Sequence, residues 1–484
     1  MTPEEIAQKF ENRPGFHLVD YAEVGLPIFK LWVDVISLEP REIPTTDEFV
    51  LRLISEGVHD ADTLRSFLGL ERRIFETTLT SLLDNIWITE NETDKYMLTT
   101  KGRKILVEGA DISPQDETIS IDFDGITRRP ISVGREILSK PSDLKMLGSI
   151  EIRPYPASPP FLADLQLADV QKVIRKQYGR QYEAKAILHL NRIARRTKLF
   201  RKAVCLVFKA SRSKNVEVEF VINGVNSAEH SAEFAKNRGP EKMGFSDSVT
   251  SADIRRNLHN LLSPSARKSI PSEEEVGEAR IAASAAKIVF EGARHRLERT
   301  RGKRTGPEVV EKFEEATEKL RTATDALNRF PIRNLAVYEH VHLLDEALKT
   351  SNQNLIISSP RILDSVVDGF FVRSINQLLD KNVAVTFYLP EGPSQFVQNT
   401  DGQIKNLFEL SKKNKNITFK KTRKSPINWL IKDNDYLAIT SFEWLSYKNS
   451  LRPIRRVSGL VIQDPDLIKE LRQTFLTREL KSLD

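Results

Sequence analysis

The residue types that most often carry out catalysis or bind metals are sparse in this sequence. Its 484 residues include one cysteine and eight histidines. Cys205 lies in the apolar run AVCLVF, and such surroundings indicate a packed core thiol and not a nucleophile. His340 and His342 form the only close histidine pair, but residues two apart on a helix do not face each other. We therefore expect no metal site and no cofactor.

Signatures of nucleotide-binding proteins and serine hydrolases are also missing. The sequence contains no GxxxxGK[ST], GxGxxG or GxSxG string. A single cysteine excludes an intramolecular disulfide scaffold. There is no run of about 18 apolar residues that would predict a membrane span, and the charged N-terminus MTPEEIAQKFENRPG lacks the apolar core of a secretory signal. We expect a cytoplasmic protein with no membrane partner.

Basic residues are the feature best suited to binding, because they gather in three runs. Residues 172–202 contain eleven Lys or Arg and one acid, residues 294–304 contain six Lys or Arg, and residues 412–424 contain seven and no acid. Each run can bind phosphates with an affinity that falls steeply with salt, and a solvated face is the alternative for each. In the first and third runs the expected contacts are Arg192, Arg195, Arg196, Lys198, Arg201, Lys202, Lys420, Lys421, Arg423 and Lys424.

Residues 45–110 position a further set of basic residues. Three amphipathic helices are predicted in TTDEFVLRLISEG, DADTLRSFLGL and ERRIFETTLTSLLDNIWI, followed by a strand, the polar turn ENETD and a second strand. This order is typical of a winged helix-turn-helix. The string YMLTTKGR, which runs from Tyr96 to Arg103, resembles the end of the wing in many bacterial winged-helix proteins.

The charge of this module leaves its partner open. Residues 46–109 contain eight Lys or Arg and twelve Asp or Glu, a net charge of −4. The expected nucleic-acid contacts stand at the start of the third helix and after the wing; they are Arg72, Arg73, Lys101, Arg103 and Lys104. Phosphate would repel the acidic wing tip, so a protein-binding module is the alternative.

The remaining segments complete the predicted architecture. Residues 171–202 predict one long helix, and AVCLVFKA and VEVEFVING predict a strand hairpin across SRSKN. The predicted divisions are a strand-rich segment at 1–44, the winged helix at 45–110, a loop-rich linker or subdomain at 111–170, a basic α+β domain at 171–270, a helical hairpin or coiled coil at 271–333, and an α/β domain at 334–484.

Residues 334–484 resemble the phospholipase D superfamily in the order of their elements. A strand ends in Ser359-Pro360 within LIISSPRI, a helix and a strand follow in LLDKNVAVTFYL, and later come NWLIKD, AITSFEWL and RRVSGLVIQDPDLI. In that family a His-x-Lys-x4-Asp motif performs phosphodiester chemistry, with the His as nucleophile and the Lys and a downstream Asn holding phosphate oxygens. The resemblance implies a phospholipase D-like fold here.

The catalytic residues of that motif are missing. With Asp433 as the anchor, the His position is Pro426, the Lys position is Asn428, Ser441 is retained, and the downstream Asn position is Glu443. Proline cannot be a nucleophile, asparagine carries no positive charge, and glutamate repels phosphate. The resemblance therefore implies a degenerate copy with no catalytic residue of that kind, and we expect no enzyme that works by that mechanism.

Together these features predict a multidomain α/β protein that binds DNA with little sequence preference. We expect a non-catalytic scaffold in a bacterial DNA-processing or phage-defence system, a setting that rests on analogy of architecture. A partner ATPase, helicase or nuclease and a second copy of the chain are the other candidate partners. Two alternatives stay open: a metal-dependent phosphodiesterase or nuclease around Asp433, Ser441 and Glu443, and a winged-helix transcriptional regulator that senses a ligand through its C-terminal domain.

Overall fold

The computed structural model describes the chain in two compact units. The described residues are 1–484 apart from 92–93, 135, 180–185, 212, 214, 246–257, 301–305, 391–401, 423–424, 426, 449–456 and 481–484, with only the backbone of 39–41, 110, 112–113, 178, 273, 300 and 478–480. The smaller unit comprises residues 28–136 and 158–198. The larger unit comprises residues 1–27, 137–157 and 199–484.

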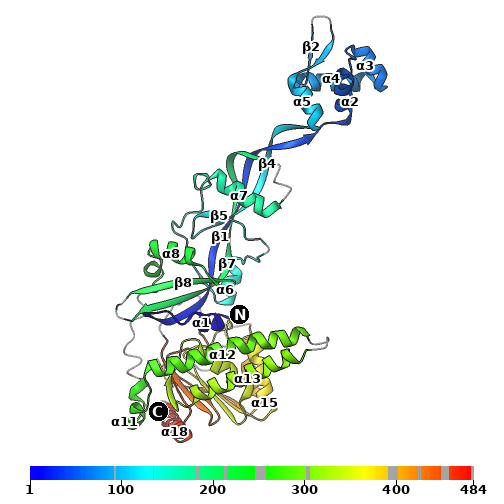
Figure 1. The fold of residues 1–484 in the computed structure, drawn as a ribbon. Helices are drawn as coiled ribbons and strands as arrows, with labels where there is room; N and C mark the ends of the chain where they lie inside the picture. Colours follow the sequence, from blue (N-terminus) through cyan, green and yellow to red (C-terminus); the bar gives the residue numbers. More distant parts are fainter. Residues whose placement is uncertain are drawn as a thin grey trace. The chain divides into compact units, whose positions relative to one another are not determined.

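An antiparallel sheet forms the frame of the smaller unit (Figure 1). Its elements are β1 (Phe16–Glu42), β4 (Ala110–Asp124), β5 (Arg129–Ile131), the short η1 (Leu162–Asp164), α7 (Leu167–Tyr178) and β7 (Ala186–Ala210). β4 pairs with β1 from Ile28 opposite Asp124 to Glu42 opposite Ala110, and β7 lies on the other side of β1. Alternate residues of β1 from Phe29 to Val35 are buried with α7, so the residues between them lie on the opposite face.

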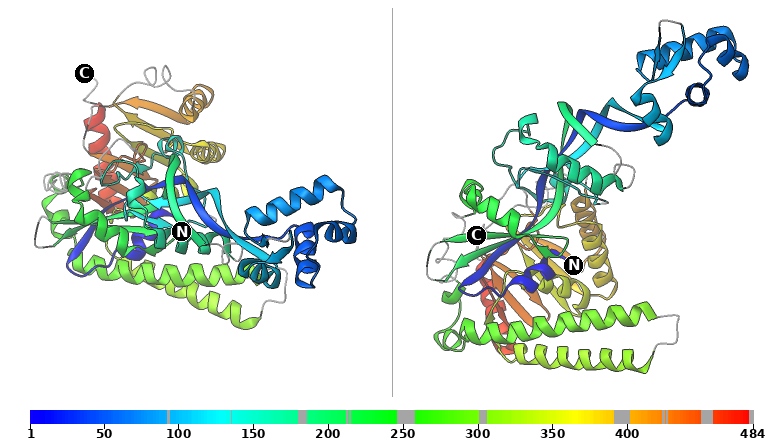
Figure 2. Two further views of the ribbon diagram at one scale, coloured as in Figure 1. Left: turned by 90° about the horizontal axis from the view of Figure 1, so that it is seen from above. Right: turned by 45° about the horizontal axis from the view of Figure 1, so that its top comes forward.

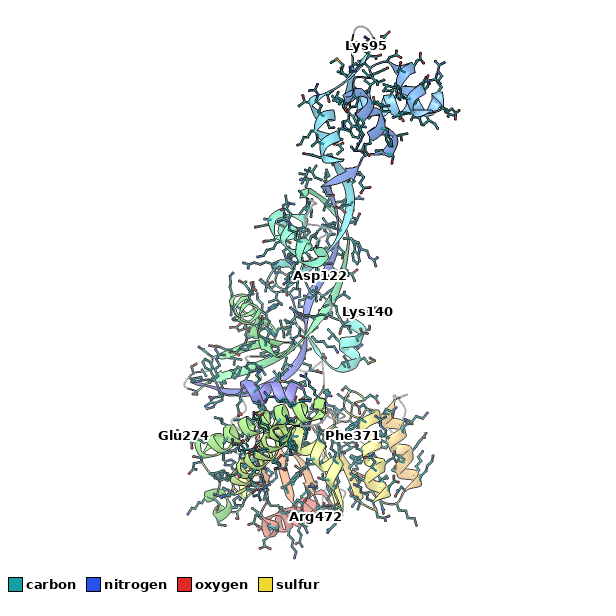
Figure 3. All side chains as sticks on the ribbon, turned by 45° about the vertical axis from the view of Figure 1, so that its right-hand side comes forward. Lys95, Asp122, Lys140, Glu274, Phe371 and Arg472 are labelled. Carbon is teal, nitrogen blue, oxygen red and sulfur yellow. The ribbon has the colours of Figure 1, made fainter. Side chains whose placement is uncertain are left out.

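Residues 45–108 form three helices, a two-stranded sheet and a final helix. These are α2 (Thr45–Ser55), α3 (Ala61–Leu68), α4 (Arg72–Asp84), β2 (Ile88–Glu90), β3 (Tyr96–Leu98) and α5 (Thr100–Glu108). The order of helices and strands is the one that the sequence predicts. Figure 3 labels Lys95, which lies just before β3. Their apolar side chains form one core that includes Leu51, Phe75 and Trp87.

Two residues of the string YMLTTKGR, Thr99 and Gly102, are required at the start of α5. The hydroxyl of Thr99 accepts a hydrogen bond from the backbone N–H of Gly102 at 3.0 Å and caps the helix. A Cβ atom at position 102 would lie 2.0 Å from the carbonyl oxygen of Trp87, so the close contact between α5 and Trp87 requires glycine there.

Residues 186–202 belong to a strand, so the long helix predicted across 171–202 is wrong beyond Tyr178. α7 ends at Tyr178 and β7 begins at Ala186. Buried Ile187 and Leu190 and half-buried Ile193 recur every three residues, which imitates a helical face. Arg, Lys, Ala and Leu favour a helix locally, but packing in the sheet beside β1 prevails over that preference. The start of the segment predicted as a loop-rich linker is also a strand, β4.

The first part of the larger unit is a small α+β assembly. It contains α1 (Pro3–Phe10), α6 (Pro141–Leu147), β6 (Ile150–Glu151), β8 (Val216–Ile222), β9 (Val225–Asn226), α8 (Ala228–Lys236) and α9 (Gly239–Lys242). β7 and β8 pair antiparallel, which confirms the predicted strand hairpin. Cys205 is fully buried in β7 as predicted, and burial raises the pKa of its thiol far above the ordinary range.

Two long antiparallel helices follow, in the region where a helical hairpin or coiled coil is predicted (Figure 2). The helices of this region are α11 (Pro264–Lys268), α12 (Glu273–Thr300) and α13 (Pro307–Asn328). The rings of Phe290 and Phe313 lie 5.5 Å apart between α12 and α13. On another side of α12, the buried guanidinium of Arg280 lies 3.4 Å from a carboxylate oxygen of Glu11 and 3.4 Å from one of Glu339. These ion pairs tie α12 to the rest of its unit.

A seven-stranded mixed sheet ends the larger unit. Its strands are β10 (Ile332–Asn334), β11 (Asn354–Ser358), β12 (Ala384–Leu389), β13 (Ile417–Lys421), β14 (Asn428–Lys432), β15 (Tyr436–Thr440) and β16 (Gly459–Ile462). The order is β10-β16-β15-β14-β11-β12-β13. β11, β12 and β13 are parallel, and the other neighbours are antiparallel.

Helices cover both faces of this sheet. They are α14 (Glu339–Thr350), α15 (Gly369–Asp380), α17 (Gln403–Lys413) and α18 (Pro465–Leu480). α14, α15 and α17 pack on the face that carries Leu355 and Leu430, whereas α18 packs through Phe475 on the face that carries Trp429. Burial on both faces explains why these strands read as continuous apolar runs. None of the described helices is both long enough and apolar enough to cross a bilayer.

Candidate functional site

Three arginines of the first basic run are exposed on β7 within the smaller unit. These are Arg192, Arg195 and Arg196. The guanidinium carbon of Arg195 lies 4.9 Å from the ring centroid of Trp32 on β1, a cation–π contact. Arg196 donates a hydrogen bond from Nε to the carbonyl oxygen of Pro160 at 3.0 Å. We call the three residues the β7 arginines.

Arg192 is held by a carboxylate of the neighbouring strand. Its Nε lies 2.7 Å from Oδ2 of Asp34, and its side chain is 78% exposed. Hydrogen bonds from Arg192 and Thr118 lower the pKa of Asp34 below its ordinary value, so the pair is charged at neutral pH. An exposed ion pair of this kind is weak. A phosphate group can therefore compete with Asp34 for Arg192.

Lys30 and Trp32 share this face with Asp34, although no motif predicted them as site residues. The ammonium of Lys30 lies 6.0 Å from the ring centroid of Trp32. Asp122, labelled in Figure 3, stands opposite Lys30 on β4, is buried, and has a pKa raised by that burial. The alternation in FKLWVDV is the signal that could have placed Lys30, Trp32 and Asp34 together.

The other predicted residues of the first run have different surroundings. Lys198 is half-buried at the end of the smaller unit. Arg201 is half-buried and Lys202 is exposed, and both belong to the larger unit. Of the six residues predicted in the first run, only the three β7 arginines are therefore both exposed and within the smaller unit.

The basic residues of the 45–108 module lie at opposite ends of α4. Arg72 and Arg73 are exposed at its start, and Nε of Arg72 lies 2.9 Å from Oε1 of Glu76. Lys101 donates from Nζ to the carbonyl oxygen of Asn85 at 3.1 Å, next to the other end of α4. α4 has 13 residues and is about 20 Å long, so the predicted contacts do not form one cluster.

The two remaining basic residues of the module, Arg103 and Lys104, are exposed on α5, where Nζ of Lys104 lies 3.8 Å from Oε1 of Glu108. The same module exposes large apolar side chains. Phe67 is 70% exposed at the end of α3, and Ile74 is 50% exposed near the start of α4. Arg72 and Arg73 therefore have an apolar neighbour, Ile74, on their own helix.

The third basic run lies at an edge of the C-terminal sheet. Lys420 and Lys421 are exposed on β13, the last strand in the order. Nζ of Lys420 lies 5.8 Å from the ring centroid of Tyr388. Arg423, Lys424 and Pro426 lie outside the described residues.

Polar residues of the expected degenerate motif gather at one end of this sheet, where β11 and β15 end and β14 and β16 begin. We call it the Ser359 end. Asn428 donates from Nδ2 to the carbonyl oxygen of Phe442 at 3.0 Å. Ser441 accepts at Oγ from the N–H of Ser458 at 3.1 Å. Glu443 accepts from the hydroxyl of Ser446 at 2.6 Å. These side chains are thus bonded to their own chain.

Asp433 lies at the opposite end of β14 from this group. Its carboxylate accepts hydrogen bonds from the backbone N–H groups of residues 352, 353 and 354 at 2.9, 2.7 and 2.7 Å. The five residues of β14 separate it from Asn428 by about 17 Å. The structure therefore does not bring Asp433 together with Ser441 and Glu443, the three residues of the alternative hydrolytic site.

His340 reaches the Ser359 end from α14, although no local signal predicts this. Its Nε2 lies 2.8 Å from Oγ1 of Thr440, and its Nδ1 lies 3.1 Å from the carbonyl oxygen of Ala336. Burial lowers the pKa of His340 to about 4. The ring is therefore neutral at pH 7, with Nδ1–H donating to the carbonyl and Nε2 accepting from the Thr440 hydroxyl. A Cβ atom at position 459 would lie 2.6 Å from Nε2, so Gly459 makes room for the imidazole.

No protein-family model and no curated protein sequence matches the chain. Part of the chain is similar to several solved structures, and three of these each have a TM-score of 0.23. Nuc of Salmonella typhimurium, a phospholipase D family member, is 11% identical over 30% of this chain and 92% of its own. NucT of Helicobacter pylori is 14% identical over 31% and 97%. The archaeal chromatin protein TrmBL2, reported to bind DNA in a novel mode, is 13% identical over 37% and 71%.

Proposed function

We propose that this protein is a non-catalytic nucleic-acid-binding component, with the β7 arginines as its principal contact. The exposure of three arginines along one strand carries the proposal. Guanidinium groups bind phosphate oxygens through paired N–H donors. Lys30 adds a further positive charge near the Trp32 ring that Arg195 also contacts, while Asp34 holds Arg192 only by a surface ion pair. A strand with such residues contacts the sugar-phosphate backbone and so binds DNA with little sequence preference.

The C-terminal sheet supports the non-catalytic part of the proposal. We propose that it is a phospholipase D-like domain with a degenerate motif. Asn428 stands where that motif has lysine, and its amide donates to Phe442 inside the chain. Glu443 stands at the downstream asparagine position and lies 3.9 Å from Arg361. The buried, neutral His340 has both ring nitrogens engaged, so it does not replace the missing nucleophile.

The test measures binding to labelled duplex and single-stranded DNA across a salt series, with Mg²⁺ present and product length checked on a denaturing gel. We expect salt-dependent binding and intact DNA. Arg192→Glu, Arg195→Glu and Arg196→Glu combined should reduce the slope of log K against log salt by roughly 2 to 3, since each lost phosphate contact removes about 0.9. Cleavage that copurifies with the protein would contradict the non-catalytic role.

A matched control reverses three exposed basic residues elsewhere. Lys312, Lys319 and Arg321 on α13 have side chains that are 59, 61 and 68% exposed, and each is paired with a glutamate on its own helix. Changing all three to glutamate gives the same change in net charge. Equal losses in the two triple variants would show that net charge governs binding, and the β7 arginines would then not be the contact.

The 45–108 module has a second candidate function. We propose that it is a winged helix, because its three helices, two-stranded sheet and Thr99–Gly102 helix start follow the predicted order. Exposed Phe67 and Ile74 and the net charge of −4 favour a protein partner, such as an ATPase, helicase or nuclease, over DNA. In the same salt series, reversal of Arg72 and Arg73 should then leave DNA affinity unchanged. The bacterial defence setting stays a prediction.

A further inference from the structure

Helix α12 carries a row of eight exposed residues with no packing partner in the described part of the chain. They follow one another at alternating spacings of four and three, the spacing of a coiled-coil seam. They are Glu274, Glu278, Ile281, Ala285, Ile288, Gly292, His295 and Arg299. We call this row the α12 stripe. Glu274, near its beginning, is labelled in Figure 3.

The other faces of α12 already account for its packing within the larger unit. Phe290 meets Phe313 of α13. Ser284 accepts a hydrogen bond from Nε2 of Gln8 on α1 at 2.8 Å, and buried Arg280 pairs with Glu11 and Glu339. The α12 stripe is thus a third face, and its residues are exposed within the part of the chain that the structure describes.

The middle of the α12 stripe is apolar, whereas a helix face that contacts only water is usually polar. Ile281 and Ile288 are 44 and 54% exposed, and Val289 beside them is 54% exposed. Single exposed apolar residues are common, but two isoleucines seven residues apart, with Ala285 between them, form a continuous seam. Favourable interaction with the helix dipole explains acids near the start and bases near the end of a helix. It does not explain the apolar centre.

The order of residues along the α12 stripe is self-complementary when two copies run in opposite directions. In an antiparallel pair centred between residues 286 and 287, Ile281 lies opposite Gly292 of the second copy. Ala285 then lies opposite Ile288, so each large side chain of the apolar centre faces a small one. The acidic residues Glu274 and Glu278 lie opposite Arg299 and His295.

The same residues disfavour a parallel pair. Parallel pairing would place Glu274 against Glu274 and Arg299 against Arg299, and it would leave Gly292 facing Gly292. Like charges opposite each other are destabilising, and facing small residues leave a gap. A two-fold axis relates the same surface on both copies, as closed dimers require.

From this pattern we infer that the protein self-associates as an antiparallel dimer through the α12 stripe. The inference does not use the β7 arginines, so its failure would leave the nucleic-acid proposal untouched. It locates the second copy on the helical hairpin and not on the C-terminal sheet.

The first test is sedimentation velocity over a concentration series with the full chain. We expect a monomer–dimer equilibrium for the unaltered protein and at least about tenfold weaker association for Ile281→Glu with Ile288→Glu. Ile137→Glu is the control, because Ile137 is 90% exposed and lies outside α12. A monomer at every concentration at low salt would overturn the inference, as would association of the double variant equal to that of the unaltered chain.

A charge exchange keeps the test independent of folding. Arg299→Glu should weaken the dimer, and Glu274→Lys added to it should restore association, because the exchanged residues again face opposite charges. Absence of restoration would overturn the proposed register.

Cysteine cross-linking tests the direction of the helices. Cys205 is the only native cysteine and is fully buried, so introduced thiols report alone. Under mild oxidation, a mixture of Ala285→Cys and Ile288→Cys proteins should form mainly the mixed dimer. Cross-linking of Ile288→Cys with itself in preference to the mixture would indicate a parallel pair and overturn the inference.

Discussion

The β7 arginines and the Ser359 end of the C-terminal sheet both contain polar residues that the sequence indicates as candidate site residues, but the two groups differ in their exposure to solvent. The β7 arginines are exposed and held by one carboxylate, one ring and one carbonyl at the surface. At the Ser359 end, Asn428, Thr440 and His340 are buried. Nε2 of His340 is hydrogen-bonded to the hydroxyl of Thr440, and the amide of Asn428 donates to the carbonyl oxygen of Phe442. A phosphate can reach the first group, whereas the second group uses its hydrogen bonds to hold the sheet together. Availability, and not residue type, separates a binding surface from a structural one.

The largest expected effect concerns Asp433, which lies at the other end of β14 from the Ser359 end and also has its carboxylate engaged in hydrogen bonds to the chain. Asp433→Ala removes the acceptor of three backbone hydrogen bonds and leaves those N–H groups partly buried. We expect a loss of about 3 kcal/mol in the free energy of unfolding, measured by urea denaturation. Asp435→Ala, a change at a 56% exposed side chain in the same turn, is the control. DNA binding of the variant should be unchanged in buffer without urea, under conditions where the variant is folded. Loss of DNA binding by the folded variant would place Asp433 in the functional surface.

The second expected effect is a pH dependence that originates at His340. Its pKa is about 4 in the folded chain and 6.5 when unperturbed, so the unfolded state binds a proton first as the pH falls. The stability contributed by the neutral ring is present above pH 6.5 and is lost progressively down to about pH 4. The full loss is roughly 3 kcal/mol.

His340→Gln provides the comparison for that measurement. Glutamine does not titrate, so urea denaturation at several pH values should show a shallower decline for this variant between pH 6.5 and about 4. Parallel declines in the two proteins would mean that His340 is not neutral and buried as described.

The smallest expected effect concerns Asp34, the carboxylate that holds Arg192 on β7. Asp34→Asn removes the charge that competes with phosphate for Arg192. DNA affinity should rise by less than about fivefold, because a surface ion pair of this kind is weak. Glu76→Gln, which frees Arg72 in the same way, is the matched control. A fall in affinity with Asp34→Asn would mean that Asp34 orients Arg192 for binding and does not compete with the ligand.

The helices of the 45–108 module and the α12–α13 hairpin could be predicted because their contacts are local. Asp60, for example, accepts a hydrogen bond from the N–H of Thr63 at 2.8 Å and fixes the start of α3. β7 could not be predicted in the same way. Ile187 and Leu190 are buried with Phe29 and Leu31, which are more than 150 residues away in the sequence, and their spacing imitates a helix.

The candidate site shows the same division. The exposed arginines follow from composition, since a basic run is exposed in most conformations. The contact between His340 and Thr440 joins residues that are 100 positions apart in the sequence, so only the packing of α14 against β15 creates it. That residue 428 carries no positive charge is read from the sequence, whereas the hydrogen bond from its amide to the carbonyl oxygen of Phe442 required the structure.

The basic residues of β13 have a further consequence for the C-terminal sheet. β13 is the outer strand in this order, so among the described residues no further strand pairs with its other edge. Lys420 and Lys421 are exposed on this strand, and the charged ammonium groups would have to lose water if another sheet added to it. We therefore expect Lys420 and Lys421 to disfavour the addition of another sheet at this edge.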